Sequence, residues 1–162
     1  MTLDGPNAPH HEREPIMGML CDFFVGTPEE ALRYVHRHDD EDEGEAIEEL
    51  LQPAEMKGLE MLVLGLLWAI LAKEPFSLDR HSVPEQFFGE EHSHWLGELP
   101  TPMVQLLAQL DDAGLQAAAT QWAATEEMRG DPEVLTWCIS TLRDMAQRAL
   151  REGKGLHYWG CM

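Results

Sequence analysis

The chain has 162 residues, of which 44% are hydrophobic and 25% are charged, and its formal net charge is −19. This length suggests one domain that can bury a core without disulfides. The excess of carboxylates argues against nucleic-acid binding, because phosphates would be repelled. Anionic membrane surfaces are disfavoured for the same reason, whereas a basic protein partner is permitted.

The N-terminus differs in composition from the rest of the chain. Residues 1–15 contain three prolines and little that can be buried, so we expect a mobile arm before a single globular domain over residues 16–162. The three cysteines, Cys21, Cys138 and Cys161, form no CxxC pair, and the sequence shows no signal-peptide pattern. We therefore expect reduced thiols and a cytoplasmic protein.

The domain begins with a strand and a helix. Met17–Val25 is apolar and aromatic apart from Asp22, which predicts a strand covered on both faces. The following TPEE segment is a helix start, in which Thr27 caps the helix and Glu30 completes a capping box. This helix should run to about residue 38.

The segment 39–49, DDEDEGEAIEE, carries eight acids and no base. Like charges at this density repel one another, so we expect residues 39–43 to form an exposed loop before a short helix over Glu45–Leu51. The candidate residues for binding a basic partner are Asp39, Asp40, Glu41, Asp42 and Glu43. The alternative is a solvated loop that contributes only solubility.

The most apolar window is Gly58–Ala72, which contains one charged residue, Glu60. Pro53 suits a first helical turn and Pro75 follows the window, so we predict a central buried helix from about Pro53 to Ala72. The apolar run is shorter than the ~20 residues that cross a bilayer. A buried helix is therefore favoured over a membrane span.

Residues 73–100 contain three prolines, two glycines and several aromatic residues. This composition predicts an irregular segment that covers the central helix. Phe87, Phe88 and Trp95 are candidates for the lining of a ligand pocket, and simple packing of these rings is the alternative.

The C-terminal third predicts three amphipathic helices and a strand. The helices start at Thr101-Pro102, at Asp111 or Asp112, and at Asp131-Pro132, and the last one ends near Gly153. The apolar tail Leu156–Met162 predicts a strand, and its best partner is Met17–Val25, because a lone strand is unstable. The expected fold is α+β and mostly helical, with a central buried helix, amphipathic helices packed around it, and a small sheet that pairs the terminal strands.

Three short segments carry a family resemblance: the opening Met17-Gly18-Met19, the segment Gly89-Glu90-Glu91-His92-Ser93 before a helical stretch ending at Asp111, and a final helix ending Arg151-Glu152-Gly153 before a strand. Together they resemble the YfbM-like family of uncharacterised bacterial proteins, which are single α+β domains of similar length. The resemblance covers Met17–Met162. It implies an α+β fold and assigns no role to any residue.

Two histidine pairs are the candidates for metal chemistry: His36 with His38, and His92 with His94. On a helix, residues i and i+2 point about 200° apart, so the first pair cannot share a metal ion there. His92 and His94 could do so on extended backbone. We expect no metal, and the alternative is a metal-dependent hydrolase built on both pairs.

No sequence motif indicates a catalytic residue or a cofactor. The chain has no GxSxG, GxxxxGK[ST] or GxGxxG pattern, and Cys138 lies on an apolar helix stripe that suits a buried thiol. We therefore expect no cofactor and favour a binding protein over an enzyme. The resulting hypothesis is a small acidic protein that binds a basic partner, as immunity proteins bind toxins.

Overall fold

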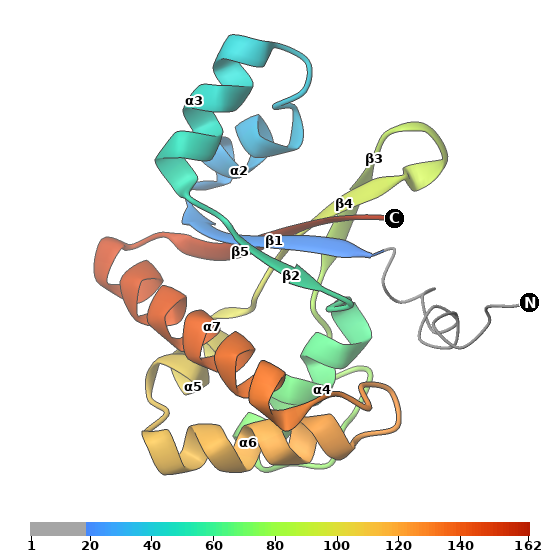
Figure 1. Ribbon diagram of the computed structural model, residues 1–162, viewed down its shortest axis with the longest axis vertical. Helices are drawn as coiled ribbons and strands as arrows, with labels where there is room; N and C mark the ends of the chain where they lie inside the picture. Colours follow the sequence, from blue (N-terminus) through green and yellow to red (C-terminus); the bar gives the residue numbers. More distant parts are fainter. Residues whose placement is uncertain (1–18) are drawn as a thin grey trace, which may run out of the picture.

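The computed structural model describes residues 19–162, which form an α+β fold. Its centre is one antiparallel sheet with the strand order β2-β1-β5-β4-β3 (Figure 1). The strands are β1 (Leu20–Gly26), β2 (Ala54–Lys57), β3 (Glu85–Phe88), β4 (His94–Glu98) and β5 (Gly155–Cys161). The predicted pairing of the two ends of the chain is confirmed, because Leu20 lies opposite Cys161 and Gly26 opposite Gly155. The predicted N-terminal arm, Met17 and Gly18 lie outside the described residues.

Helices lie over both faces of the sheet (Figure 1). One face is covered by α4 (Met61–Ala72), α5 (Thr101–Ala108), α6 (Asp112–Ala124) and α7 (Pro132–Glu152). The other face carries α2 (Pro28–Val35) and α3 (Glu41–Leu51), and a short 3₁₀ turn, Glu90–His92, joins β3 to β4. Within residues 19–162, no helix has the length and apolar character that a membrane span requires.

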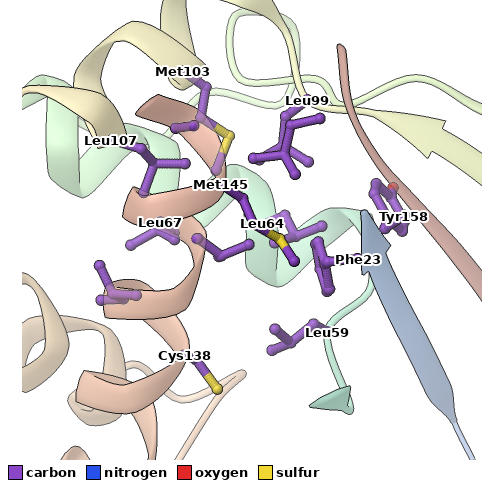
Figure 2. Packing of buried hydrophobic residues seen from close by; sticks show 14 of the residues in the cluster. Phe23, Leu59, Leu64, Leu67, Leu99, Met103, Leu107, Cys138, Met145 and Tyr158 are labelled. Atoms are coloured by element: carbon purple, nitrogen blue, oxygen red, sulfur yellow. The ribbon is translucent and has the colours of Figure 1, made fainter. Parts of the chain in front are cut away.

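Strand alternation divides the core into two clusters. Phe23 and Tyr158 point from the sheet toward Leu64 and Met145 in the larger cluster (Figure 2). Phe24, one residue further along β1, packs in the smaller cluster under α2 and α3. Because each fully buried side chain of this size contributes about 1.5–3 kcal/mol, both clusters stabilise the fold.

The predicted helix starts are largely confirmed. Thr27 and Glu30 form the expected capping box, and Asp111 and Asp131 cap α6 and α7 with their carboxylates. The helix α5 begins at Thr101, but no side chain caps it. The predicted end of the first helix is wrong, because α2 ends at Val35 rather than near residue 38, whereas Gly153 caps the end of α7 as expected.

The central apolar helix is shorter than predicted. It begins at Met61 with Glu60 as its cap, and Pro53 lies outside it, because strand β2 intervenes. The chain turns sharply on both sides of β2, with positive φ at Gln52 and Gly58. The helix α4 is mostly buried, as expected, and α7 is the helix that contacts α5, α6, β1 and β5.

The segment 73–100 is less irregular than predicted. Its second half is the β3–β4 hairpin, and its turn includes Gly89, whose φ of 81° suits glycine. The first half is irregular and is held by Glu74, whose carboxylate accepts hydrogen bonds from Arg80 and contacts the ring of buried His81.

Candidate functional site

The acidic surface comprises the eight carboxylates of residues 39–49. Every one of them is exposed: Asp39, Asp40, Glu41, Asp42, Glu43, Glu45, Glu48 and Glu49. Six lie within α3 and two in the turn before it. The expectation that residues 39–43 form a loop is therefore wrong for the last three of them, which open the helix.

Local chemistry explains why these acids are helical despite their repulsion. Asp40 caps α3 by accepting hydrogen bonds from the main-chain N–H groups of Asp42 and Glu43. Acids in the first turn are also favoured by the positive end of the helix dipole. On the opposite side, Ile47 and Leu51 are buried against the sheet. The helix therefore turns its carboxylates to solvent and its apolar stripe inward.

The helix α3 lies unusually close to the end of α2. Gly44 is buried in α3, and a Cβ atom at this position would collide with the main-chain carbonyl oxygen of Arg37. Only glycine permits this approach without movement of one of the two segments. The acidic surface is consequently held at a defined distance from α2.

A buried polar cluster anchors α2 and α3 to the sheet; we call it the Arg37 cluster, and it comprises Asp22, Tyr34, Arg37, Glu48 and Trp159. Arg37 is only 7% exposed. Its guanidinium lies 3.9 Å from the ring centre of Tyr34 and 4.2 Å from that of Trp159. The guanidinium group has therefore lost contact with water and lies between two aromatic rings, whose faces attract a cation.

Hydrogen bonds complete the Arg37 cluster. Arg37 donates from Nη1 to the Tyr34 carbonyl oxygen at 2.7 Å and from Nε to Glu48 Oε2 at 3.1 Å. The Tyr34 hydroxyl donates to Asp22 Oδ2 at 2.6 Å, and Arg37 Nη2 lies 3.8 Å from the same oxygen. One cation thus links strand β1 to both helices.

Burial dominates the titration of Asp22. Desolvation raises the pKa of its carboxyl group above the usual range, while the Tyr34 hydrogen bond and the Arg37 charge act in the opposite direction. Burial, together with the nearby Asp22 carboxylate, raises the pKa of the Tyr34 hydroxyl. Tyr34 therefore remains protonated and donates its hydrogen bond throughout the ordinary pH range.

A cavity of about 400 Å³ lies beside the Arg37 cluster, where α2 meets α3. Its walls include Glu41, Glu45 and Glu48, which are spaced along one face of α3, together with His38. Carboxylates arranged in this way can accept hydrogen bonds from an ammonium or guanidinium group. Sequence patterning indicated the acids but not this hollow, because the turn between the helices forms its other wall.

The structure separates the members of both histidine pairs. The rings of His36 and His94 both lie 6.0 Å from the ring of Phe88. His38 lines the acidic cavity instead, and His92 packs against Phe87. Within residues 19–162, no group of three or more histidine, cysteine or acidic side chains has a metal-binding arrangement.

The three aromatic candidates for a pocket lie in the β3–β4 hairpin. Phe87 pairs with Trp95 across the hairpin, with ring centres 6.1 Å apart. Phe88 faces the opposite side of the sheet, where it packs in the smaller core cluster with Trp159. Because neighbouring strand residues alternate, the three side chains do not face one common pocket.

Two of the three thiols, those of Cys21 and Cys138, are buried in surroundings that do not favour nucleophilic chemistry. Burial raises the pKa of Cys21 to about 12 and that of Cys138 to about 11. The Cys21 thiol donates to the Leu59 carbonyl oxygen at 2.8 Å. Since the thiolate is the nucleophile, these two groups are disfavoured as catalysts.

No protein-family model matches the chain, and comparison with curated proteins and with solved structures also gives no match. The resemblance to the YfbM-like family stays a prediction.

Proposed function

We propose that this chain is a small protein-binding module that engages a basic protein partner through the acidic surface, in the manner of immunity proteins. The observation that carries the proposal is the exposure of all eight carboxylates on α3 and its preceding turn. The nearby arginines neutralise only part of this charge, because Arg37 pairs with Glu48 and Arg33 lies 3.8 Å from Glu43, whereas the acids number eight. A field of one sign accelerates the encounter with an oppositely charged partner.

Rigid presentation of the acids supports the same proposal. The Arg37 cluster ties α2 and α3 to the central strands, and Gly44 sets their spacing. A surface that is ordered before binding loses less conformational entropy when a complex forms. The cavity lined by Glu41, Glu45 and Glu48 would receive a lysine or arginine side chain of the partner.

The alternative of a metal-dependent hydrolase receives less support. It requires the two histidine pairs to converge with carboxylates, but His38 and His92 lie apart from His36 and His94 in the described part of the chain. The negative field would also repel nucleic acid, so a basic protein remains the preferred partner.

The test begins with capture of partners from a cell extract by the tagged chain, followed by stopped-flow measurement of association with the purified partner. The test variant carries Glu41→Gln, Glu45→Gln and Glu49→Gln, which preserve the Asp40 cap and the contact of Arg37 with Glu48. We expect association about tenfold slower than wild type at low salt, and the difference should shrink as salt screens the charges.

A matched control removes three exposed carboxylates elsewhere: Glu90→Gln, Glu127→Gln and Asp144→Asn. The control has the same net charge as the test variant, so it should associate at nearly the wild-type rate. Equal rates for test variant, control and wild type across salt concentrations would show that the acidic surface is not the interface.

A further inference from the structure

Among residues 19–162, strand β2 is an edge of the sheet and is hydrogen-bonded to β1 on its inner side. Gly58 N–H donates to the Met19 carbonyl at 3.2 Å. In an antiparallel pair, residues directed at the partner alternate with residues directed away. Met56 therefore directs its main-chain polar groups toward β1, and Glu55 and Lys57 direct theirs outward. The outer edge of β2 therefore presents the main-chain N–H and C=O groups of Glu55 and Lys57 for hydrogen bonding to another strand.

An apolar groove of about 410 Å³ lies beside this edge, between β2 and the start of α7. Met56, Leu59 and Leu135 form part of its wall, together with Val134 and Trp137. Val134 is 55% exposed and Trp137 is 53% exposed. An exposed tryptophan next to an edge strand is typical of a surface that contacts another protein.

We propose that a second copy of this chain occupies this edge, through antiparallel pairing of two β2 strands around a two-fold axis at Met56. Only Glu55 and Lys57 direct main-chain polar groups toward the second copy, so three registers are possible near this axis. In these registers Glu55 pairs with Glu55 of the other copy, Lys57 pairs with Lys57, or Glu55 pairs with Lys57. The first two bring like charges together, which is destabilising. The third register forms two contacts between opposite charges, because the two-fold axis generates a second copy of each Glu55–Lys57 contact.

The same register brings the two grooves together. Met56 lies opposite Cys21 of the larger core, so its side chain is on the face that carries α7. Two copies of Met56 would meet at the axis, with Trp137 of each copy beside the junction. The other edge strand, β3, offers no equivalent match, since Glu85 is its one charged residue. Charge complementarity therefore favours β2 as the edge that self-associates.

Sedimentation equilibrium over micromolar concentrations tests the proposal. Wild type should shift from the monomer mass of 18.3 kDa toward twice that value. Glu55→Lys and Lys57→Glu should each weaken self-association about tenfold or more, because each opposes like charges twice across the axis. Both side chains are exposed, so the variants should fold, as circular dichroism will verify.

Mixing the two single variants is the decisive test of the proposed register. A Glu55→Lys chain facing a Lys57→Glu chain regains opposite charges at both contacts, so the mixture should form dimers more tightly than either variant alone. The double variant with both substitutions should self-associate like wild type, and Trp137→Ala should weaken the dimer. The exposed controls Glu90→Lys and Arg151→Glu repeat the two charge changes away from β2 and α3 and should leave the association constant nearly unchanged.

Three results would overturn the proposal. The first is a wild-type chain that stays monomeric at every concentration, which would leave the edge to another protein or to solvent. The second is a mixture of the two single variants that associates no better than either alone. The third is a wild-type dimer that neither single variant weakens, which would place the contact on another surface.

Discussion

Replacing Arg37 by methionine should release α2 and α3 from the sheet, because Arg37 links the two helices to β1. The substitution retains much of the apolar stem but removes the guanidinium that lies between Tyr34 and Trp159. It also removes the donor to the Tyr34 carbonyl oxygen and the one cation 3.8 Å from Asp22.

The expected loss follows from what remains buried. Removing one partner of a buried ion pair costs about 3–5 kcal/mol, because the other charge is left uncompensated. Asp22 can take up a proton, so we expect a value near the lower end, about 3 kcal/mol. The Glu48 contact adds little, since that side chain is 48% exposed. For a domain of this size, the melting temperature should fall by roughly 10 °C.

The loss should depend on pH, and the sign follows from Asp22. Burial raises the pKa of its carboxyl group in the folded state, and Arg37 is one of the groups that oppose this rise. Without Arg37, the folded-state pKa rises further above the unfolded value of about 3.9. A raised pKa contributes stability below the unfolded pKa, and that contribution is lost as the pH rises through the folded pKa. The deficit of Arg37→Met should therefore widen between acidic and neutral pH.

Urea unfolding monitored by circular dichroism at about pH 5 and about pH 8 measures both effects. Arg33→Met is the matched control, because Arg33 is exposed on α2, one turn before Arg37, and its substitution should cost less than about 0.5 kcal/mol. Adding Asp22→Asn to Arg37→Met should recover part of the loss and remove its pH dependence. A loss below about 1 kcal/mol for Arg37→Met, or an equal loss at both pH values, would refute the reasoning.

Three further predictions concern the fold and its thiols. Gly44→Ala should lower the free energy of unfolding by about 1–3 kcal/mol, because the added methyl collides with the Arg37 carbonyl; a stability gain, as intrinsic helix propensity alone predicts, would contradict this. Deleting residues 156–162 should abolish cooperative unfolding, because β5 joins β1 to β4; a truncated chain with an unchanged melting temperature would contradict that. Cys21 and Cys138, with pKa values raised to about 12 and 11, should react slowly with a thiol reagent in the native state and quickly in urea; rapid native labelling of Cys138 would show that the thiol is accessible and activated.

Most of the features that sequence predicted well depend on neighbouring residues. The Thr27 capping box, the Asp131 cap and the Gly153 end of α7 each involve chemistry within one or two turns. Pairing of the two ends of the chain was also predictable, because two apolar segments each lacked any other partner. The helix caps require no knowledge of how distant segments approach one another, whereas the pairing of the two ends was inferred by elimination.

The features that were missed depend on contacts between distant segments. Strand β2 has four residues, and a single buried side chain, Met56, defines its inner face, which is too short a pattern to detect. Sequence showed Asp22 as the one charge in an apolar strand, and a buried carboxylate needs a partner. The need for a partner was therefore predictable, but the identity of the partner was not. Sequence alone could not choose between Arg33 and Arg37, because the choice depends on which side of α2 faces the sheet.

The acidic surface and the β2 edge predict opposite responses to salt. A two-fold axis that extends an antiparallel sheet keeps equivalent faces on the same side, so the dimer would place both copies of α3 on one face. Each chain carries a net charge of −19, so repulsion between the two copies outweighs the two exposed Glu55–Lys57 contacts. Added salt should therefore strengthen self-association by screening this repulsion. Binding of a basic partner should weaken with salt instead. A salt titration of both equilibria thus separates the two surfaces, and loss of either response identifies which proposal is wrong.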